Sequence, residues 1–290
     1  MFYAQLLKEG TSEGRLDLQE TNNLDQVDDT HPQILLMMGA EYDESMVRAQ
    51  KKRWPNVLVG AIDPRPSICK NLRGVDFIIA NGIESQDFYY QFCDNVFVYY
   101  TYPFLKGGDE ARVQPNEDRF TMGYHGNKIH LESMIPRITD AINAIAAQRP
   151  ILLKCIYNVK ELGRSWRIDR ALKCDVQHIQ YSEEAYTALG DCHLGLMPQL
   201  IPIQRKNLVH WVGSTLLRRN NEEKSDYFLR FKPTTNIGRL LVFAQMKIPV
   251  ICDLAPSTAH IIENNVSGYL AHHTAAWAHW LEKAADDGND

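Results

Sequence analysis

The feature that most constrains this chain is a repeated alternation of short apolar runs with helix-like segments. The runs "QILLMMG", "NVLVGAID" and "VDFIIANG" lack the polar alternation of a half-exposed strand, so each predicts a strand buried on both faces. Segments with helical spacing, such as "DESMVRAQKKRW", stand between such runs. Buried strands that alternate with helices indicate a parallel sheet wrapped by helices, and the predicted fold class is α/β.

The alternation breaks once and then restarts. The stretch "LKGGDEARVQPNEDR", residues 105–119, has paired glycines, a proline and many charges, which is typical of a linker. After it, one long helix is expected over 130–148, with Pro136 tolerated near its start, and further buried strands follow. We therefore expect two Rossmann-like domains whose parallel sheets face a cleft. Their predicted limits are a helix and linker over 1–30, domains over 31–110 and 118–275, and a C-terminal helix over 276–290.

Composition excludes several classes of function. The formal net charge of -5 argues against a general nucleic-acid binder. The longest apolar runs are far shorter than a membrane span, and the N-terminus lacks the pattern of a secretory signal. Six scattered cysteines without a C-x-x-C pair favour reduced thiols in a cytoplasmic protein. No cluster has the spacing of metal ligands, so we expect neither a metal site nor a cofactor.

The stretch "FKPTTNIGRLLVFAQMKIPVICDL" has a polar lead-in that a core does not need. Lys232 precedes a helix that is expected to begin near Thr234, where a lysine opposes the helix dipole unless an anion is bound. Asn236 and Arg239 lie three residues apart and would share a helix face. This arrangement favours a phosphate-bearing ligand. The alternative is a solvated lysine and an arginine paired with a surface acid.

Two further segments offer polar groups to a ligand. In "GYHGN", the glycines let the backbone approach a ligand closely, and His125 and Asn127 would then face it, although a simple strand-to-helix turn fits equally. In "PSTAHII", Ser257 and Thr258 are either helix caps or the start of an amide cradle for a diphosphate. His260 lies either near the ligand or on a half-exposed helix face.

These motifs, in this order, resemble the C-terminal, donor-binding domain of the GT-B-fold glycosyltransferases. The resemblance runs from Phe120 to about Leu270 and includes "YSEEAYTALGDCHLGLMP". Many retaining members carry two glutamates around the donor-site helix, and here Thr234 and Val242 stand at those positions. The glutamate often found in the next helix is replaced by His260. The first half resembles a reduced acceptor domain.

The resemblance implies a glycosyltransferase that moves a sugar from a nucleotide-sugar donor to a glycan or lipid-linked acceptor, without a metal. It implies the following donor-binding residues: His125, Asn127, Lys232, Asn236, Arg239, Ser257, Thr258 and His260. A non-catalytic nucleotide- or sugar-binding module of the same fold is the alternative. A third possibility is another two-domain enzyme with an activated phosphate substrate, such as an epimerase.

A general base is expected at the carboxyl ends of the strands of the first domain. The candidates are Glu41, Asp43 and Asp63, with Glu84 as a further acid. Asp43 is also a good helix cap and Asp63 a good turn former before proline. A carboxylate nucleophile in two-step chemistry stays open as well.

The segment 199–228 is an insertion relative to the minimal fold. It combines basic and aromatic residues and can contact a membrane surface, where lipid-linked acceptors lie, or pack on its own domain as a helix. The expected location is cytoplasmic, with peripheral contact at the membrane through this segment.

Overall fold

The computed structural model describes residues 31–38, 44–64, 72, 74–100, 105, 112–162, 167–202, 229–231 and 236–287 of the chain. The chain divides into two compact units, Met1–Phe104 with Pro233–Gly238, and Leu105–Lys232 with Arg239–Asp290. Glu41, Asp43, Lys232 and residues 203–228 lie outside the described residues, so the predictions made for them stay predictions.

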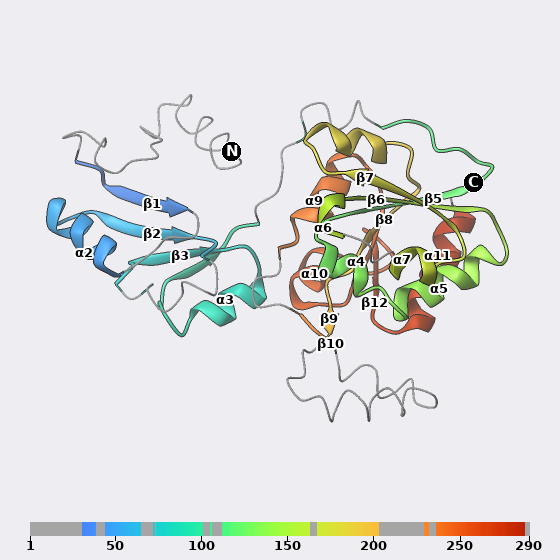
Figure 1. Ribbon diagram of the computed structural model, residues 1–290. Helices are drawn as coiled ribbons and strands as arrows, with labels where there is room; N and C mark the ends of the chain where they lie inside the picture. The colour runs from blue at the N-terminus through green and yellow to red at the C-terminus, as the bar shows by residue number, and fades with distance from the viewer. Residues whose placement is uncertain are drawn as a thin grey trace, which may run out of the picture. The chain divides into compact units, whose positions relative to one another are not determined.

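The first unit holds a four-stranded parallel sheet in the order β1-β2-β3-β4 (Figure 1). The strands are short apolar runs, as the sequence predicts. Val47 of one helix and Tyr89 of the other share a core with Val59, Ala61 and Ile78 of the strands. The elements are β1 (Ile34–Met38), α2 (Glu44–Arg53), β2 (Leu58–Ile62), β3 (Phe77–Ala80), α3 (Ile83–Tyr89) and β4 (Val96–Val98).

The second unit is built on a six-stranded parallel sheet in the order β12-β11-β8-β5-β6-β7 (Figure 1). A separate two-stranded antiparallel ladder, β9 with β10, joins the two ends of the segment 203–228. The elements are β5 (Phe120–His125), α4 (Lys128–Glu132), α5 (Arg137–Ala146), β6 (Ile151–Tyr157), α6 (Val159–Leu162), α7 (Arg167–Ala171), β7 (Asp175–Gln180), the 3-10 helix η3 (Glu184–Leu189), β8 (Leu194–Met197), β9 (Ile201–Pro202), β10 (Leu229–Arg230), α9 (Gly238–Gln245), β11 (Val250–Asp253), α10 (Pro256–Ile261), β12 (Tyr269–Ala271) and α11 (Thr274–Asp287).

Every residue of β5, β6, β8 and β11 is buried, which explains why these strands are mostly apolar in sequence. The C-terminal helix α11 packs against α5, and its Trp277 is fully buried in the same core as Ile138 and Ile142. The two parallel sheets confirm the predicted α/β class. The cleft between them stays a prediction.

The single helix predicted over 130–148 is wrong. The chain forms α4 and α5 instead, separated by a turn over 133–136, with Pro136 at the cap position of α5. A proline inside a helix removes one hydrogen bond and clashes with the carbonyl four residues before it, so a break costs less than a continuous helix. The break makes Arg137 the first residue of α5.

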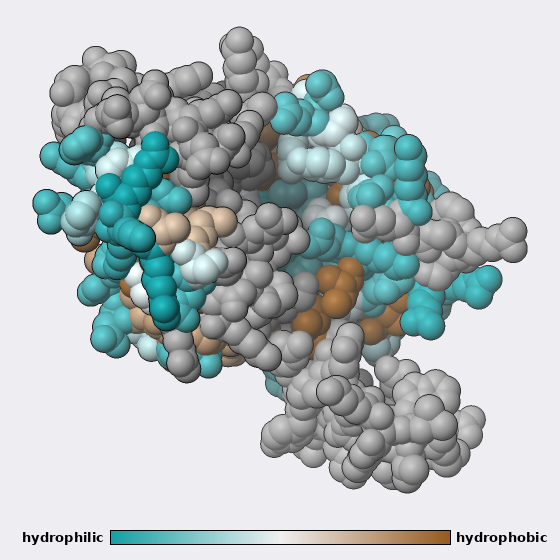
Figure 2. Space-filling view, turned by 60° about the vertical axis from the view of Figure 1, so that its left-hand side comes forward, coloured by the Kyte–Doolittle hydropathy of each residue, from teal (hydrophilic) through white to brown (hydrophobic). Residues whose placement is uncertain are grey.

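The described surface is largely hydrophilic in the view of Figure 2, with apolar side chains exposed in small groups. Among the described residues, no helix combines the length and the apolar character needed to cross a bilayer.

Candidate functional site

The carboxyl edge of the six-stranded sheet is where a ligand is expected in the second unit. From β5 the chain proceeds outward through β6 and β7, whereas from β8 it proceeds the other way through β11 and β12. The adjacent strands β5 and β8 therefore form a topological switch point. In open α/β sheets, ligands bind at the carboxyl ends of the strands at such a point.

The turn after β5 contains a glycine that allows neighbouring side chains to lie close to the main chain. Gly126 has a φ of 143°, in the region that favours glycine, and its N–H donates to the carbonyl of Ile156 at 3.0 Å. A Cβ atom at this position would lie 2.9 Å from Cδ of Arg239 and 3.1 Å from the hydroxyl of Tyr124. The glycine thus leaves room for the arginine side chain directly above the turn.

Arg239 carries the clearest sign of a missing partner. The residue is half-buried as a whole, but its Nη1 is enclosed and has no hydrogen-bond partner within the described part of the chain. Burial lowers the pKa of the guanidinium, while the electrostatic effects of Tyr124, Cys252 and Asp253 nearby act in the opposite direction. The Tyr124 hydroxyl in turn donates to the main-chain oxygen of Asn127 at 2.7 Å. An enclosed cation with an unused donor is suited to an anion.

The His125 side chain is buried and contacts the main chain of Arg239, so it does not lie on an open surface. Its ring is buried between Tyr186 and Phe243, with centroid distances of 5.2 and 5.1 Å, and its Nε2 lies 3.1 Å from the carbonyl oxygen of Arg239. Burial lowers the pKa of His125 to about 3. The ring is therefore neutral, and Nε2–H donates to Arg239, so we assign His125 a positioning role.

This pKa predicts a loss of stability in acid. The folded pKa lies below the usual value of about 6.5, so the unfolded chain binds more protons between these two values, and stability falls as pH drops below about 6.5. Relative to a His125→Gln variant, which keeps a donor for Arg239, the wild type should lose about 2 kcal/mol more between pH 6.5 and 5. Urea unfolding at both pH values measures this difference, and parallel pH profiles for the two proteins would contradict it.

The start of α9 differs from the prediction. The helix begins at Gly238, not near Thr234, so Asn236 lies before it and does not share a helix face with Arg239. The Asn236 side-chain oxygen accepts a hydrogen bond from the N–H of Gly238 at 2.6 Å, which satisfies one free donor of the helix start. Gly238 has no strong preference for the helical conformation. The Asn236 cap, rather than the sequence periodicity, therefore determines where α9 begins.

The residues of α10 are used largely within their own turn. Ser257 and Thr258 are fully buried. The Thr258 hydroxyl lies 2.7 Å from the carbonyl oxygen of Asp253 and accepts from the N–H of Ala255 at 3.0 Å. It therefore fixes the entry to α10 from the third helical position, because Ala255 and not Ser257 or Thr258 is the N-cap residue, while His260 lies exposed in the last turn. Asn127 is exposed at the turn after β5, and its side chain makes no capping bond.

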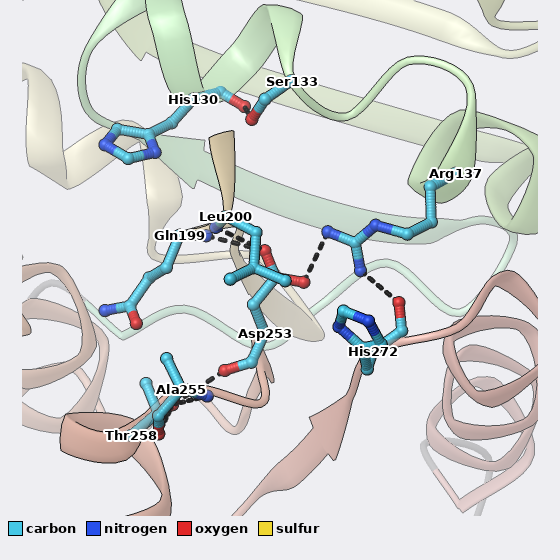
Figure 3. Close-up of polar contacts among 9 residues, drawn as sticks. All are labelled: His130, Ser133, Arg137, Gln199, Leu200, Asp253, Ala255, Thr258 and His272. Carbon is cyan, nitrogen blue, oxygen red and sulfur yellow. Dashed lines mark hydrogen bonds and ion pairs between the residues drawn. The ribbon is translucent and has the colours of Figure 1, made fainter. Parts of the chain in front are cut away.

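A buried ionic network that we did not predict holds this edge together. Asp253, at the end of β11, accepts the main-chain N–H groups of Gln199 and Leu200 at 2.8 and 2.9 Å through one oxygen (Figure 3). Its other oxygen forms an ion pair with Arg137 at 2.6 Å, a contact that does not meet the geometry of a hydrogen bond. Arg137 also donates to the carbonyl of His272, at the end of β12.

Gln199 is a second group whose hydrogen-bonding capacity is unused. Its side chain is fully buried, and neither its amide oxygen nor its amide nitrogen has a hydrogen-bond partner within the part of the chain that the structure describes. Figure 3 shows the side chain pointing away from Asp253, which holds only the main chain of Gln199. The amide group has two N–H donors and one acceptor oxygen, and it lies two residues beyond the end of β8.

The comparisons with known proteins come from structure alone, since no family model and no curated protein match this chain. A glycosyltransferase from Rickettsia africae is 10% identical, covers 97% of this chain and 77% of its own, and has a TM-score of 0.55. Anabaena Alr3699/HepE in complex with UDP and glucose is 13% identical, over 87% of this chain and 69% of its own, with a TM-score of 0.53. The chain has the fold of the GT-B glycosyltransferases.

This GT-B fold confirms the resemblance noted in the sequence. The chain spans 52% of the length of TarM, to which it is 11% identical with a TM-score of 0.51. The catalytic domain of starch synthase IV from Arabidopsis thaliana, bound to ADP and acarbose, is 9% identical over 99% of this chain and 69% of its own, with a TM-score of 0.53. At such identities the comparisons establish the fold and do not establish the activity.

In the first unit, Asp63 follows β2 with a φ of 41°, and its N–H donates to the carbonyl of Ile79 at 2.9 Å. Glu84 is buried in the first turn of α3. Both acids lie at carboxyl ends of strands, where the GT-B resemblance places a base, and their catalytic role stays a prediction. Among the described residues, no group of three or more His, Cys, Asp or Glu side chains could hold a metal ion.

Proposed function

We propose that this protein is a glycosyltransferase that moves a sugar from a nucleotide-activated donor to a glycan or lipid-linked acceptor. The observation that carries the proposal is Arg239, whose enclosed Nη1, beside the glycine turn at the switch point, has no acceptor among the residues that the structure describes. Its support is the GT-B fold and the nucleotides present in the similar structures, UDP in Alr3699/HepE and ADP in starch synthase IV.

Arg239 fits the chemistry of the leaving group. Sugar transfer releases a nucleoside phosphate, on which negative charge grows as the glycosidic bond breaks. A fixed cation stabilises that charge more strongly in an enclosed site than in water. Arginine also presents several donors in a planar fork, which suits phosphate oxygens. Gly126 makes room for the Arg239 side chain at this turn, and exposed Asn127 stands beside it.

Arg239 is also the reason we propose metal-independent transfer. A guanidinium can take the place that a divalent cation fills in metal-dependent enzymes. Activity with a nucleotide-sugar donor should therefore be unchanged, within about twofold, after treatment with a chelator. Loss of activity that is restored by adding Mg²⁺ or Mn²⁺ would contradict this proposal.

A non-catalytic nucleotide- or sugar-binding module is the second candidate, and one observation favours it. Val242 is fully buried on α9 at a position where many retaining GT-B enzymes carry a glutamate, so no carboxylate stands there. The base or nucleophile would then have to come from Asp63, Glu84 or the predicted Glu41 and Asp43.

Two measurements on the full chain test the proposal. Thermal denaturation with uridine and adenosine diphosphates should show a rise in stability, about 2.7 kcal/mol for a ligand at 100 times its Kd. Incubation with the corresponding nucleotide sugars should then release the nucleoside diphosphate, with or without an acceptor. Binding without release would favour the non-catalytic module, and the lack of any stabilising nucleotide would overturn both readings.

A further inference from the structure

Gln199 combines a fixed main chain with a side-chain amide that the fold does not use. Its main-chain N–H donates to Asp253 at 2.8 Å, and the N–H of Leu200 donates to the same carboxylate oxygen at 2.9 Å. Asp253 is itself held by its ion pair with Arg137. In Figure 3 the amide points away from both charged side chains, so the ionic network determines where Gln199 stands without binding its amide.

The amide is unfavourable for the folded protein by itself. The Gln199 side chain is fully buried, and across the described ranges neither its oxygen nor its nitrogen has a hydrogen-bond partner. A polar group that gives up its hydrogen bonds to water and gains none in return destabilises the folded state. A methionine would fill a similar volume without this cost. The missing partner is either a ligand or an internal water molecule, and the place of Gln199 in the fold favours a ligand.

Gln199 stands beside the proposed phosphate site. The strands β8 and β5 are adjacent, Gly126 directly follows β5, and Gln199 lies two residues beyond β8. Neighbouring strands lie about 4.8 Å apart, so the two carboxyl ends are separated by roughly that distance. A group bonded to a phosphate at the Gly126 turn can therefore lie next to Gln199.

The other side of the phosphate site has a different chemistry. Tyr181 directly follows β7, two strands from β5 in the direction away from β8, and is 51% exposed. Its ring packs edge-on against Tyr186 with centroids 6.1 Å apart, and Tyr186 packs on His125 at 5.2 Å. An exposed aromatic ring is suited to stacking with a flat nucleobase. In a nucleotide sugar, the base and the sugar lie on opposite sides of the diphosphate. A base on the Tyr181 side therefore leaves the sugar on the Gln199 side.

We propose that Gln199 is a specificity-determining residue for the donor, and that its amide exchanges hydrogen bonds with hydroxyl groups of the transferred sugar. This inference rests on the proposed function. The carboxamide is uncharged and both donates and accepts, as a hydroxyl does, whereas an ionised phosphate oxygen only accepts. Because the amide is enclosed, a sugar that lacks the matching hydroxyl leaves it unpaired, and a site of this kind discriminates strongly between sugars.

Calorimetry on the full chain with the Gln199→Met variant tests this inference. The probes are uridine and adenosine diphosphates and their glucose, galactose and N-acetylglucosamine derivatives, so that each nucleotide sugar has its own diphosphate as a reference. For the nucleotide sugar that the wild type binds most tightly, Gln199→Met should raise the Kd about tenfold and leave the Kd of the diphosphate unchanged. Gln148→Met, at an exposed glutamine before the amino end of β6, is the matched control and should change neither Kd.

Two further measurements distinguish sugar recognition from a structural role. At least one monodeoxy form of the same nucleotide sugar should bind the wild type about tenfold more weakly than the parent compound. Gln199→Met should bind that analogue and the parent equally, because the variant has no amide to leave unpaired. The melting temperature of ligand-free Gln199→Met should equal or exceed that of the wild type, since the variant buries no unpaired amide.

Each other outcome overturns the inference. Unchanged affinity of Gln199→Met for every nucleotide sugar would assign the amide to an internal water molecule. An equal loss for the diphosphate and its sugar derivative would show that the amide does not act through the sugar. A Gln199→Met variant that does not fold would show that the fold itself needs the amide. These results leave the proposed function in place, whereas a wild type that binds no nucleotide would overturn both.

Discussion

Replacing Asp253 with asparagine should lower the free energy of unfolding by about 3–5 kcal/mol, the cost of leaving the other charge of a buried ion pair unpaired. Arg137 is 8% exposed and Asp253 is fully buried, so water cannot replace the lost partner. One oxygen of the same carboxylate accepts two main-chain N–H groups after β8, and an asparagine oxygen can keep both, but the asparagine NH2 group would then face the Arg137 guanidinium. Urea unfolding followed by circular dichroism measures the change.

Two variants distinguish the loss of the buried ion pair from a general loss of stability. Asp286 pairs with Arg149 at the surface, and its side chain is 60% exposed, so Asp286→Asn should cost no more than about 1 kcal/mol. In the double variant Arg137→Met with Asp253→Asn, no buried charge is left unpaired. The double variant should lose less free energy of unfolding than the sum of the two single variants, by about 0.5–3 kcal/mol. Strict additivity would show that the two side chains are not coupled.

Replacing Arg239 with methionine should weaken binding of a nucleoside diphosphate by about 1.5–3 kcal/mol, the range for a hydrogen bond to a charged group. Methionine keeps most of the apolar stem against Gly126, so the fold should be preserved. Isothermal titration calorimetry gives the affinity, and circular dichroism checks the fold. Arg149→Met, at an arginine that bonds α11 and not the switch point, is the matched control and should bind like the wild type.

The lysine predicted from the sequence is tested by the same titration. Lys232 lies outside the described residues, and its role as a phosphate ligand rests on its place before α9. Lys232→Met should also weaken binding of the nucleoside diphosphate by about 1.5–3 kcal/mol if the lysine ammonium group contacts the phosphates. Unchanged affinity would leave Arg239 as the sole cation of the proposed site among the residues tested.

The fold could be predicted because its strands are buried on both faces. Mostly apolar runs such as "ILLKCIY" and "PVICD" coincide with β6 and β11, and their alternation with helices indicates a parallel sheet. The helix boundaries were less predictable because caps decide them. Pro136 divides one apolar periodicity into α4 and α5, and Asn236 delays the start of α9 to Gly238.

The candidate site was predictable only where its signal is local. Arg239 stands close to a polar lead-in, and Gly126 stands directly after a buried strand, so both were visible in the sequence. The ion pair of Asp253 with Arg137 joins residues from different elements, and Gln199 lies 54 positions from Asp253. An acid that ends a buried strand, as in "PVICD", is a signal that could have indicated a buried partner, but not which arginine supplies it.

The central claim is that the second unit holds a phosphate-bearing ligand through Arg239, and the most direct test compares a nucleoside diphosphate with its nucleoside by calorimetry. The wild type should bind the diphosphate at least about tenfold more tightly, because a charge-assisted hydrogen bond contributes about 1.5–3 kcal/mol. Arg239→Met should remove most of this difference and leave nucleoside affinity unchanged. Equal affinities for diphosphate and nucleoside in the wild type, or an equal loss of both in Arg239→Met, would contradict the account.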